Sequence, residues 1–211
     1  MGGLSEATST PAVVQLNNLG YATFYDSEKS YEVPQGLKAY VVAEGSEDVL
    51  TYVALGDVIP AGTAVMLKGS KNYGKKFELK ATKAEAYTGQ NLLMGSDEAT
   101  LTYAVVNTPC LFYKLAFGHS NTVNANVFGW YWGANNGGAF EIEGHRAWLA
   151  LPKAIANARM YPVFIDEDAT GIEQPTADNS EAGETYNLNG QRVAAPTKGL
   201  YIRNNKKVII K

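Results

Sequence analysis

The chain has 211 residues, of which 45% are hydrophobic and 18% charged, with a formal net charge of −3. The low charge and the 11% of aromatic residues exclude disorder over most of the chain, because disordered segments are highly charged and poor in aromatic residues. A net charge near zero does not supply the excess of basic residues that binds the phosphates of nucleic acid, so we expect no nucleic-acid partner. No run of about 20 apolar residues is present, so we expect no transmembrane segment.

Short alternating or apolar runs recur along the chain, each closed by Gly, Pro or Asn. The strands expected from these runs span 22–25, 37–42, 50–55, 63–68, 77–81, 101–106, 111–117, 127–132, 140–142, 147–151 and 160–165. Strands spaced by about 8–12 residues are typical of a β-sandwich. One helical turn is expected near 153–158. The sequence therefore predicts an all-β fold built on an antiparallel, sandwich-like domain.

The chain is expected to divide into three parts. Residues 12–165 form the β-sandwich-like domain, and 166–184 form an acidic linker rich in small residues. Residues 185–211 regain alternating apolar character and are expected to form a small C-terminal β-hairpin module. Asn204-Asn205 suits its tight turn, because Asn tolerates the left-handed backbone region.

One turn pattern occurs three times, at 33–39, 59–65 and 142–148. An apolar residue leads to a Gly-containing turn, then to a small Ala and an apolar strand. Gly permits the positive φ that such a turn requires. The pattern indicates either an internal repeat or the reuse of one turn by a β-protein.

Six segments follow, in order, the motifs of one family. They read GYATFY at 20–25, VPQGLKAY at 33–40, IPAGTAV at 59–65, FGWY at 128–131, GHRAWLALP at 144–152 and FIDEDATGI at 164–172. The chain thereby resembles a β-rich domain that recurs in secreted and cell-surface proteins of Bacteroidota. Trp130, His145 and Trp148 depart from the family's pattern. The resemblance implies an exported adhesion or surface protein and supplies no catalytic residue.

The end of the chain resembles a second family segment. YNLNGQRV at 186–193, KGLYI at 198–202 and KKVIIK at 206–211 are similar to the last strands of the type IX C-terminal sorting domain. The resemblance implies a secreted or cell-surface location. We expect the signal peptide to have been removed ahead of Met1-Gly2-Gly3.

Catalytic and metal-binding candidates are few. Glu141 and Glu143 lie two apart on an expected strand, where a solvated face accounts for both. Cys110 could pair with His119 or His145 as nucleophile and base, but its apolar neighbours predict a buried, inert thiol. A single Cys forms no internal disulfide. The acidic run 166–168 lacks the spacing of a Ca²⁺ loop. We expect no enzyme activity, no cofactor and no metal.

The segment 115–140 contains no Asp, Glu, Lys or Arg but is rich in Asn and aromatic residues. Aromatic rings cover the C–H faces of sugars and amides pair with their hydroxyls, so this composition suits a glycan. The candidate ligand-binding residues are Tyr131, Trp130, Trp132, His119, Asn121 and Asn135. The alternative places Trp130 and Trp132 in the core, opposite Phe140 and Ile142 across an Asn-Asn-Gly-Gly hairpin.

Two functions follow from these patterns. The first is a non-enzymatic, exported surface protein that acts in cell adhesion or as a structural module. The alternative is a carbohydrate-binding module that uses the charge-free segment, and a row of exposed coplanar aromatic side chains would favour it. The expected partner is an extracellular glycan or a protein surface.

Overall fold

The computed structural model of the chain describes residues 11–46, 49–70, 74–120, 125–156, 158–163, 165, 185–186, 199–203 and 206–210. The chain divides into two compact units, Met1–Ile165 and Asp166–Lys211. This division falls at the residue where the sequence predicted the end of the first domain. The finer boundary at 184 stays a prediction, because the expected linker 166–184 lies outside the described residues.

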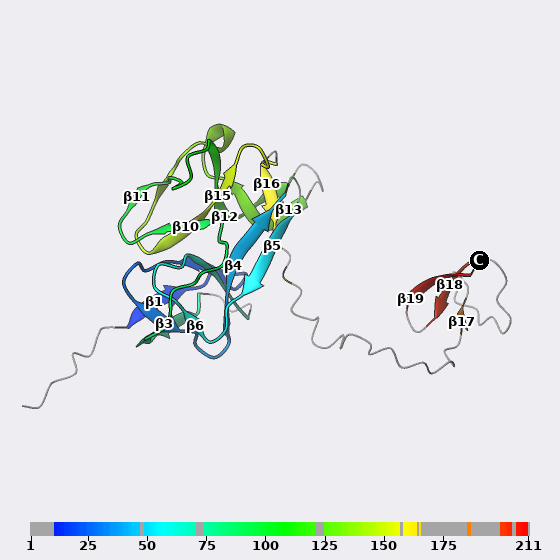
Figure 1. Cartoon of the computed structure of the whole chain (residues 1–211), viewed down its shortest axis with the longest axis horizontal. Helices are drawn as coiled ribbons and strands as arrows, with labels where there is room; N and C mark the ends of the chain where they lie inside the picture. The colour runs from blue at the N-terminus through cyan, green and yellow to red at the C-terminus, as the bar shows by residue number, and fades with distance from the viewer. Residues whose placement is uncertain are drawn as a thin grey trace, which may run out of the picture. The chain divides into compact units, whose positions relative to one another are not determined.

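The first unit is built from antiparallel sheets (Figure 1). Its largest sheet has the order β10-β15-β12-β13-β16, and a four-stranded sheet has the order β2-β7-β4-β5. Three small sheets pair β1 with β8, β3 with β6 and β9, and β11 with β14. The strands are β1 (Ala12–Gln15), β2 (Tyr21–Phe24), β3 (Ser30–Glu32), β4 (Leu37–Gly45), β5 (Leu50–Ala54), β6 (Val58–Ile59), β7 (Val65–Gly69), β8 (Lys76–Leu79), β9 (Ala81–Thr82), β10 (Leu93–Ser96), β11 (Thr100–Leu101), β12 (Cys110–Ser120), β13 (Ala125–Trp132), β14 (Glu141–Ile142), β15 (Arg146–Pro152) and β16 (Met160–Pro162). The predicted all-β, antiparallel, sandwich-like fold is confirmed.

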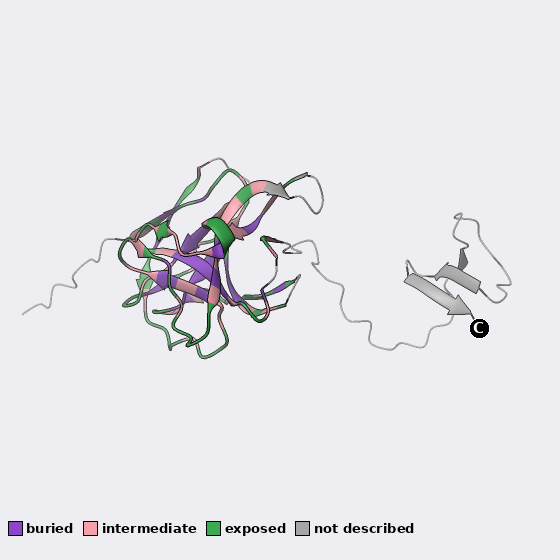
Figure 2. Cartoon of the chain, turned by 90° about the horizontal axis from the view of Figure 1, so that it is seen from above, coloured by how far each residue is buried: buried purple, intermediate pink, exposed green. Residues whose placement is uncertain are grey.

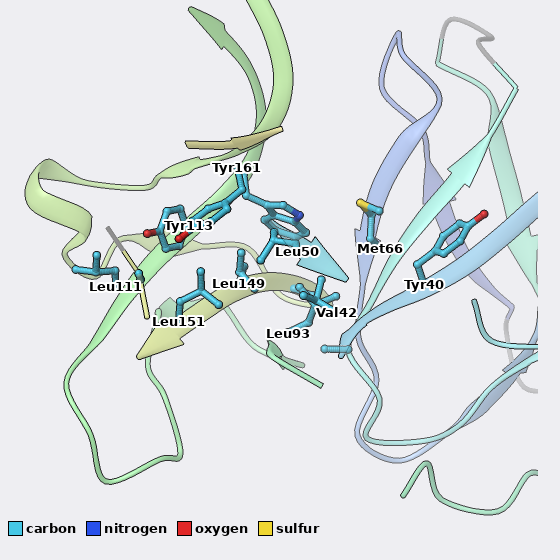
Figure 3. Packing of buried hydrophobic residues seen from close by; sticks show 14 residues of the cluster. Tyr40, Val42, Leu50, Met66, Leu93, Leu111, Tyr113, Leu149, Leu151 and Tyr161 are labelled. Carbon is cyan, nitrogen blue, oxygen red and sulfur yellow. The ribbon is translucent and has the colours of Figure 1, made fainter. Parts of the chain in front are cut away.

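The first hydrophobic core lies between the two larger sheets. The four-stranded sheet contributes Val42 and Met66, which face Leu93 and Leu149 of the five-stranded sheet (Figure 3). The buried members of this core are Tyr40, Val42, Leu50, Ala64, Met66, Leu93, Leu111, Tyr113, Trp130, Ala147, Leu149, Leu151, Ala156 and Tyr161. This packing of two sheets face to face is what makes the unit sandwich-like.

A second core covers the opposite face of the four-stranded sheet. Val41 and Leu67 point away from the first core and pack with residues of β1, β3, β6 and β8, such as Leu79 and Ile59. Figure 2 shows the buried residues gathered in the interior of the unit. Because β4 and β7 are buried on both faces, their sequences read as continuous apolar runs and lack the alternation of a half-exposed strand.

Two local expectations were wrong and a third was confirmed. The predicted strand 101–106 is largely a loop, and strand structure there is limited to β11. Residues 140–142 do not pair with β13, since β14 pairs with β11 and β13 pairs with β12 and β16. The expected helical turn near 153–158 is present, since the N–H groups of Ile155 and Ala156 donate to the carbonyl of Pro152 at 3.0 and 3.1 Å.

The three similar turns take up a positive φ at equivalent positions. Gly36 has φ +87° and Gly62 has φ +72°. In the third turn the equivalent position is held by His145, with φ +55°. A non-glycine residue in this region is uncommon and strained.

The second unit contains a three-stranded sheet in the order β17-β18-β19. Its strands are β17 (Thr185–Tyr186), β18 (Gly199–Arg203) and β19 (Lys206–Ile210). β18 and β19 pair from Gly199↔Ile210 to Arg203↔Lys206, which confirms the predicted hairpin. The predicted turn residues Asn204 and Asn205 lie outside the described residues. In the described part of the whole chain, no helix has the length and apolar character needed to cross a membrane.

Candidate functional site

The β12–β13 hairpin carries most of the residues predicted to bind a ligand. Its strands pair from Tyr113↔Trp132 to Ser120↔Ala125. The backbone of His119 pairs with Asn126 near the tip of the hairpin. The side chain of His119 and the whole of Asn121 lie outside the described residues. The geometry therefore concerns the other four candidates.

Trp130 belongs to the core and not to a ligand surface. Its exposed fraction is 0%, and its indole N–H donates a hydrogen bond to the hydroxyl of Tyr52 at 3.2 Å. The expectation that Trp130 contacts a ligand is corrected on this ground, because β5 covers the side of β13 from which the indole projects. The core alternative holds for Trp130, with partners from β5 in place of the expected Phe140 and Ile142.

Tyr131 projects from the opposite side of β13. Its hydroxyl lies 2.7 Å from the carbonyl oxygens of both Gly118 and Val127. Burial raises the pKa of the Tyr131 phenol. The hydroxyl is therefore occupied by backbone carbonyls of the β12–β13 hairpin. The half-buried ring is the part of Tyr131 that can still contact a ligand.

Trp132 and Asn135 lie together in an open concavity of about 620 Å³. The residues that line it are Trp132, Gly133, Ala134, Asn135, Asn136 and Arg159. Trp132 is half-exposed, and Asn135 and Asn136 are exposed. The indole nitrogen of Trp132 is buried, so the ring, rather than its N–H, faces the concavity. The structure therefore brings together two of the predicted site residues with four that were not predicted, among them Asn136 and Arg159.

A short 3₁₀ turn, η1 (Asn135–Gly137), contributes two of the lining residues and packs against Trp132. Asn136 has φ +56° and Gly137 has φ +66°, so two successive residues adopt the left-handed region. A Cβ on Gly137 would lie 2.9 Å from a side-chain carbon of Leu111 and 3.1 Å from Nε1 of Trp132. Glycine is therefore required at 137 for the turn to pack against the indole.

Arg159 completes the concavity from the loop before β16. Its guanidinium carbon lies 5.5 Å from the centroid of the Trp132 ring, within the range of a cation–π contact. The backbone N–H of Trp132 donates to the carbonyl of Arg159 at 3.1 Å, which fixes the two residues side by side. Arg159 lies outside the charge-free segment, and no local sequence pattern predicts its pairing with Trp132.

The aromatic side chains of β13 do not form an exposed row, because the buried Trp130 separates Trp132 from Phe128. At the far end of the hairpin, Phe128 packs on Tyr21 with ring centroids 4.3 Å apart. Phe117 of β12 is 60% exposed there. Phe117 is an exposed aromatic residue of the charge-free segment that the sequence reasoning did not select.

A second cleft, of about 800 Å³, is lined by many charged side chains, including His145, Glu143, Asp97 and Asp26. Nδ1 of His145 lies 3.1 Å from the carbonyl oxygen of Tyr25 and 3.6 Å from Oδ1 of Asp97. The side chain of Glu143 is 85% exposed and lies 3.8 Å from Nε of Arg146. His145 therefore lies beside carboxylates. Among the residues described as lining this cleft, neither the histidine nor a carboxylate is paired with a Cys or Ser nucleophile.

Asp26 is fixed in the same cleft by three donors. Its carboxylate accepts hydrogen bonds from the hydroxyl of Tyr31 at 2.7 Å and from the backbone N–H groups of Glu28 and Lys29, each at 2.9 Å. Burial alone would raise the pKa of Asp26, but these hydrogen bonds outweigh it and lower the pKa. The carboxylate therefore organises the loop after β2.

The remaining catalytic candidates are separate from one another. Cys110 is partly exposed, so its predicted burial was wrong. It lies at the first residue of β12 and does not line the His145 cleft. Glu141 and Glu143 are both exposed, as a solvated strand face requires. Among the described residues, no three His, Cys, Asp or Glu side chains form a group that could hold a metal ion.

Comparison with known proteins adds no relative: no protein-family model, no curated protein and no solved structure matches the chain.

Proposed function

We propose that this protein is a non-enzymatic binding module of an exported surface protein, and that it binds a glycan in the concavity formed by Trp132, Asn135 and Asn136. One observation carries the proposal: two exposed amides flank a half-exposed indole ring in one open hollow. An aromatic ring covers the C–H face of a pyranose, and carboxamides donate to and accept from its hydroxyls.

The shape of the site supports an extended ligand. The concavity is open, so a sugar chain can enter and leave it without any movement of the protein. The backbone N–H of Trp132 is bonded to the carbonyl of Arg159, and the η1 turn holds both amides on a tight backbone. A site that is organised before binding loses little conformational entropy when it closes on a ligand.

A glycan array of the purified chain tests the proposal. Asn135→Ala and Asn136→Gly each remove one amide from the concavity, and glycine retains the left-handed backbone at 136. Each variant should weaken binding to the selected glycan about fivefold or more. Asn18→Ala removes an exposed amide elsewhere and is the matched control. Loss of binding in the control alone, or unchanged binding in both site variants, would contradict the proposal.

Tryptophan fluorescence gives a second readout of the same site. Trp130 and Trp148 are fully buried, whereas Trp132 is half-exposed. A glycan that occupies the concavity should therefore protect one tryptophan from quenching by acrylamide and leave the other two unchanged. A ligand that binds elsewhere would leave quenching unaltered.

The exported location rests on the resemblance of the C-terminal residues 186–211 to a sorting segment. We propose that this segment directs the chain to the cell surface. A chain that ends at Asn179 should then lose surface display in a Bacteroidota host while residues 12–165 keep their thermal stability in vitro. Unchanged display of the shortened chain would contradict the sorting role.

Adhesion through a protein surface is a second candidate, and one observation favours it. Leu101, Tyr103, Val105 and Val106 lie close in sequence and are 57%, 47%, 77% and 55% exposed. Contiguous exposed apolar groups often mark contacts with other proteins. Val105→Ser should reduce attachment to host cells without changing glycan binding if this segment mediates adhesion.

A further inference from the structure

We infer that the glycan bound at Trp132 carries a carboxylate, and that Arg159 selects it. This inference rests on the proposed glycan site and deepens it, because it replaces the uncharged ligand expected from the segment 115–140 with an acidic sugar such as a uronate or a sialate.

The charge of the concavity comes from a single side chain. Of the six residues that line it, Arg159 alone carries a charge, and no Asp or Glu stands among them. Within the part of the chain that the structure describes, no salt bridge involves Arg159; Arg146 pairs with Glu143, and His145 lies beside Asp97. An exposed guanidinium without a carboxylate partner gives the hollow a local positive charge.

Arg159 lies over the Trp132 ring. Its guanidinium carbon lies 5.5 Å from the centroid of the Trp132 ring. A guanidinium that contacts an aromatic ring keeps its N–H donors in its own plane, where they remain able to bind a ligand. The contact also restricts the rotamers of a long side chain, so that less entropy is lost when the ligand binds.

The N–H donors of Arg159 match the carboxylate of an acidic sugar. The fork of N–H groups on an arginine fits the two oxygens of a carboxylate, and such charge-assisted pairs are stronger than neutral hydrogen bonds. The exposed amides of Asn135 and Asn136 line the same hollow and suit the hydroxyls around a pyranose ring. Together these groups match a sugar ring that has hydroxyls and one carboxylate.

Two matched pairs of probes test the inference: methyl β-D-glucuronide against methyl β-D-glucoside, and 3′-sialyllactose against lactose. Isothermal titration with the full chain should show about tenfold or greater preference for the carboxylated member of at least one pair. Arg159→Gln should reduce that preference to within about twofold, and Arg159→Lys should keep part of it. Raising the salt concentration should weaken binding of the acidic probe more than that of the neutral probe.

Arg146→Gln is the matched control, because it removes the same charge from the other cleft and should leave the preference unchanged. Equal binding of acidic and neutral members, or a preference retained in Arg159→Gln, would overturn the inference while the glycan site itself stands. Absence of binding by every glycan on the array and by all four probes would overturn the proposed function together with the inference.

Discussion

The indole N–H of Trp130 donates a hydrogen bond to the hydroxyl of Tyr52 at 3.2 Å, and this bond joins β13 of the five-stranded sheet to β5 of the four-stranded sheet. Trp130 has an exposed fraction of 0%, so water cannot replace the hydroxyl if it is lost. The bond therefore couples the two layers that enclose the first core, and it lies two residues before Trp132 on β13.

Tyr52→Phe should lower the free energy of unfolding by about 1–3 kcal/mol, because it leaves a buried N–H without its acceptor. Urea-induced unfolding measures the effect, and a double-mutant cycle with Trp130→Phe isolates the coupling between the two side chains. Tyr103→Phe removes the hydroxyl of an exposed tyrosine and should change stability by less than about 0.5 kcal/mol. Equal stability of Tyr52→Phe and the unmodified chain would contradict the role of the bond.

Asn91 should contribute to stability through a different connection between the sheets. Its amide N–H donates to the carbonyl of Ala64 at 2.8 Å, and its Oδ1 accepts from the backbone N–H groups of Leu93 at 3.0 Å and Val42 at 3.4 Å. Asn91→Ala should cost about 1–3 kcal/mol in urea unfolding, because it leaves these backbone groups without partners.

Asn91→Asp tests the N–H donor of Asn91 separately from its Oδ1 acceptor. The carboxylate keeps the oxygen that Leu93 and Val42 need but places a negative charge against the carbonyl of Ala64. Its destabilisation should therefore be larger near pH 7, where the carboxylate is ionised, than near pH 4. An Asp variant with pH-independent stability equal to that of the Asn protein would show that the N–H of Asn91 is unimportant.

The strands that the sequence predicts best are those bounded by strong turn residues. The run 37–42 follows Pro34 and Gly36, and it corresponds to the first part of β4. The run 101–106 is as apolar, yet most of it is a loop, because the ladder of β11 with β14 covers just two residue pairs. Local hydrophobicity identifies a segment that can pair, whereas its partner strand decides whether it does.

The candidate site was predictable in composition but not in geometry. Trp130 and Trp132 share one face of β13 and have the same side chain, so no local pattern tells the buried residue from the half-exposed one. The difference arises because β5 covers Trp130 through Tyr52, whereas Trp132 lies at the end of the strand beside η1. Arg159 meets Trp132 through the pairing of β13 with β16, a contact between residues distant in sequence.

Cys110 should react with a thiol reagent in the folded protein, but more slowly than in the unfolded chain. Burial raises the pKa of its thiol. The Sγ donates to the carbonyl of Thr108 at 3.4 Å, a bond that only the protonated thiol can make. Because the thiolate is the reactive form, the folded protein holds less of it than the unfolded chain at the same pH.

The ratio of unfolded to folded labelling rates should fall as the pH rises through the raised pKa of Cys110. Since a raised folded-state pKa favours the neutral thiol, the folded protein should also lose a little stability as the pH increases above the ordinary thiol value of about 8.5. Labelling followed by mass spectrometry between about pH 7 and pH 10 measures the first effect. Folded-state labelling as fast as that of the unfolded chain at every pH would contradict the assignment.

His145 should be better replaced by glycine than by alanine. Its φ of +55° is in the region that Gly36 and Gly62 occupy at the equivalent points of the two similar turns. His145→Ala keeps the left-handed strain and loses the contact of Nδ1 with the carbonyl of Tyr25, whereas His145→Gly loses the same contact and relieves the strain. The glycine variant should therefore be more stable than the alanine variant by about 1 kcal/mol, which thermal unfolding can resolve.

Gly36→Ala and Gly62→Ala supply the control, because a Cβ at either position meets no atom within 4 Å and the change in φ preference is the whole effect. Each should destabilise the protein by about 1 kcal/mol. If His145→Ala proved as stable as His145→Gly while the two glycine controls behaved as expected, the third turn would not share the backbone requirement of the other two.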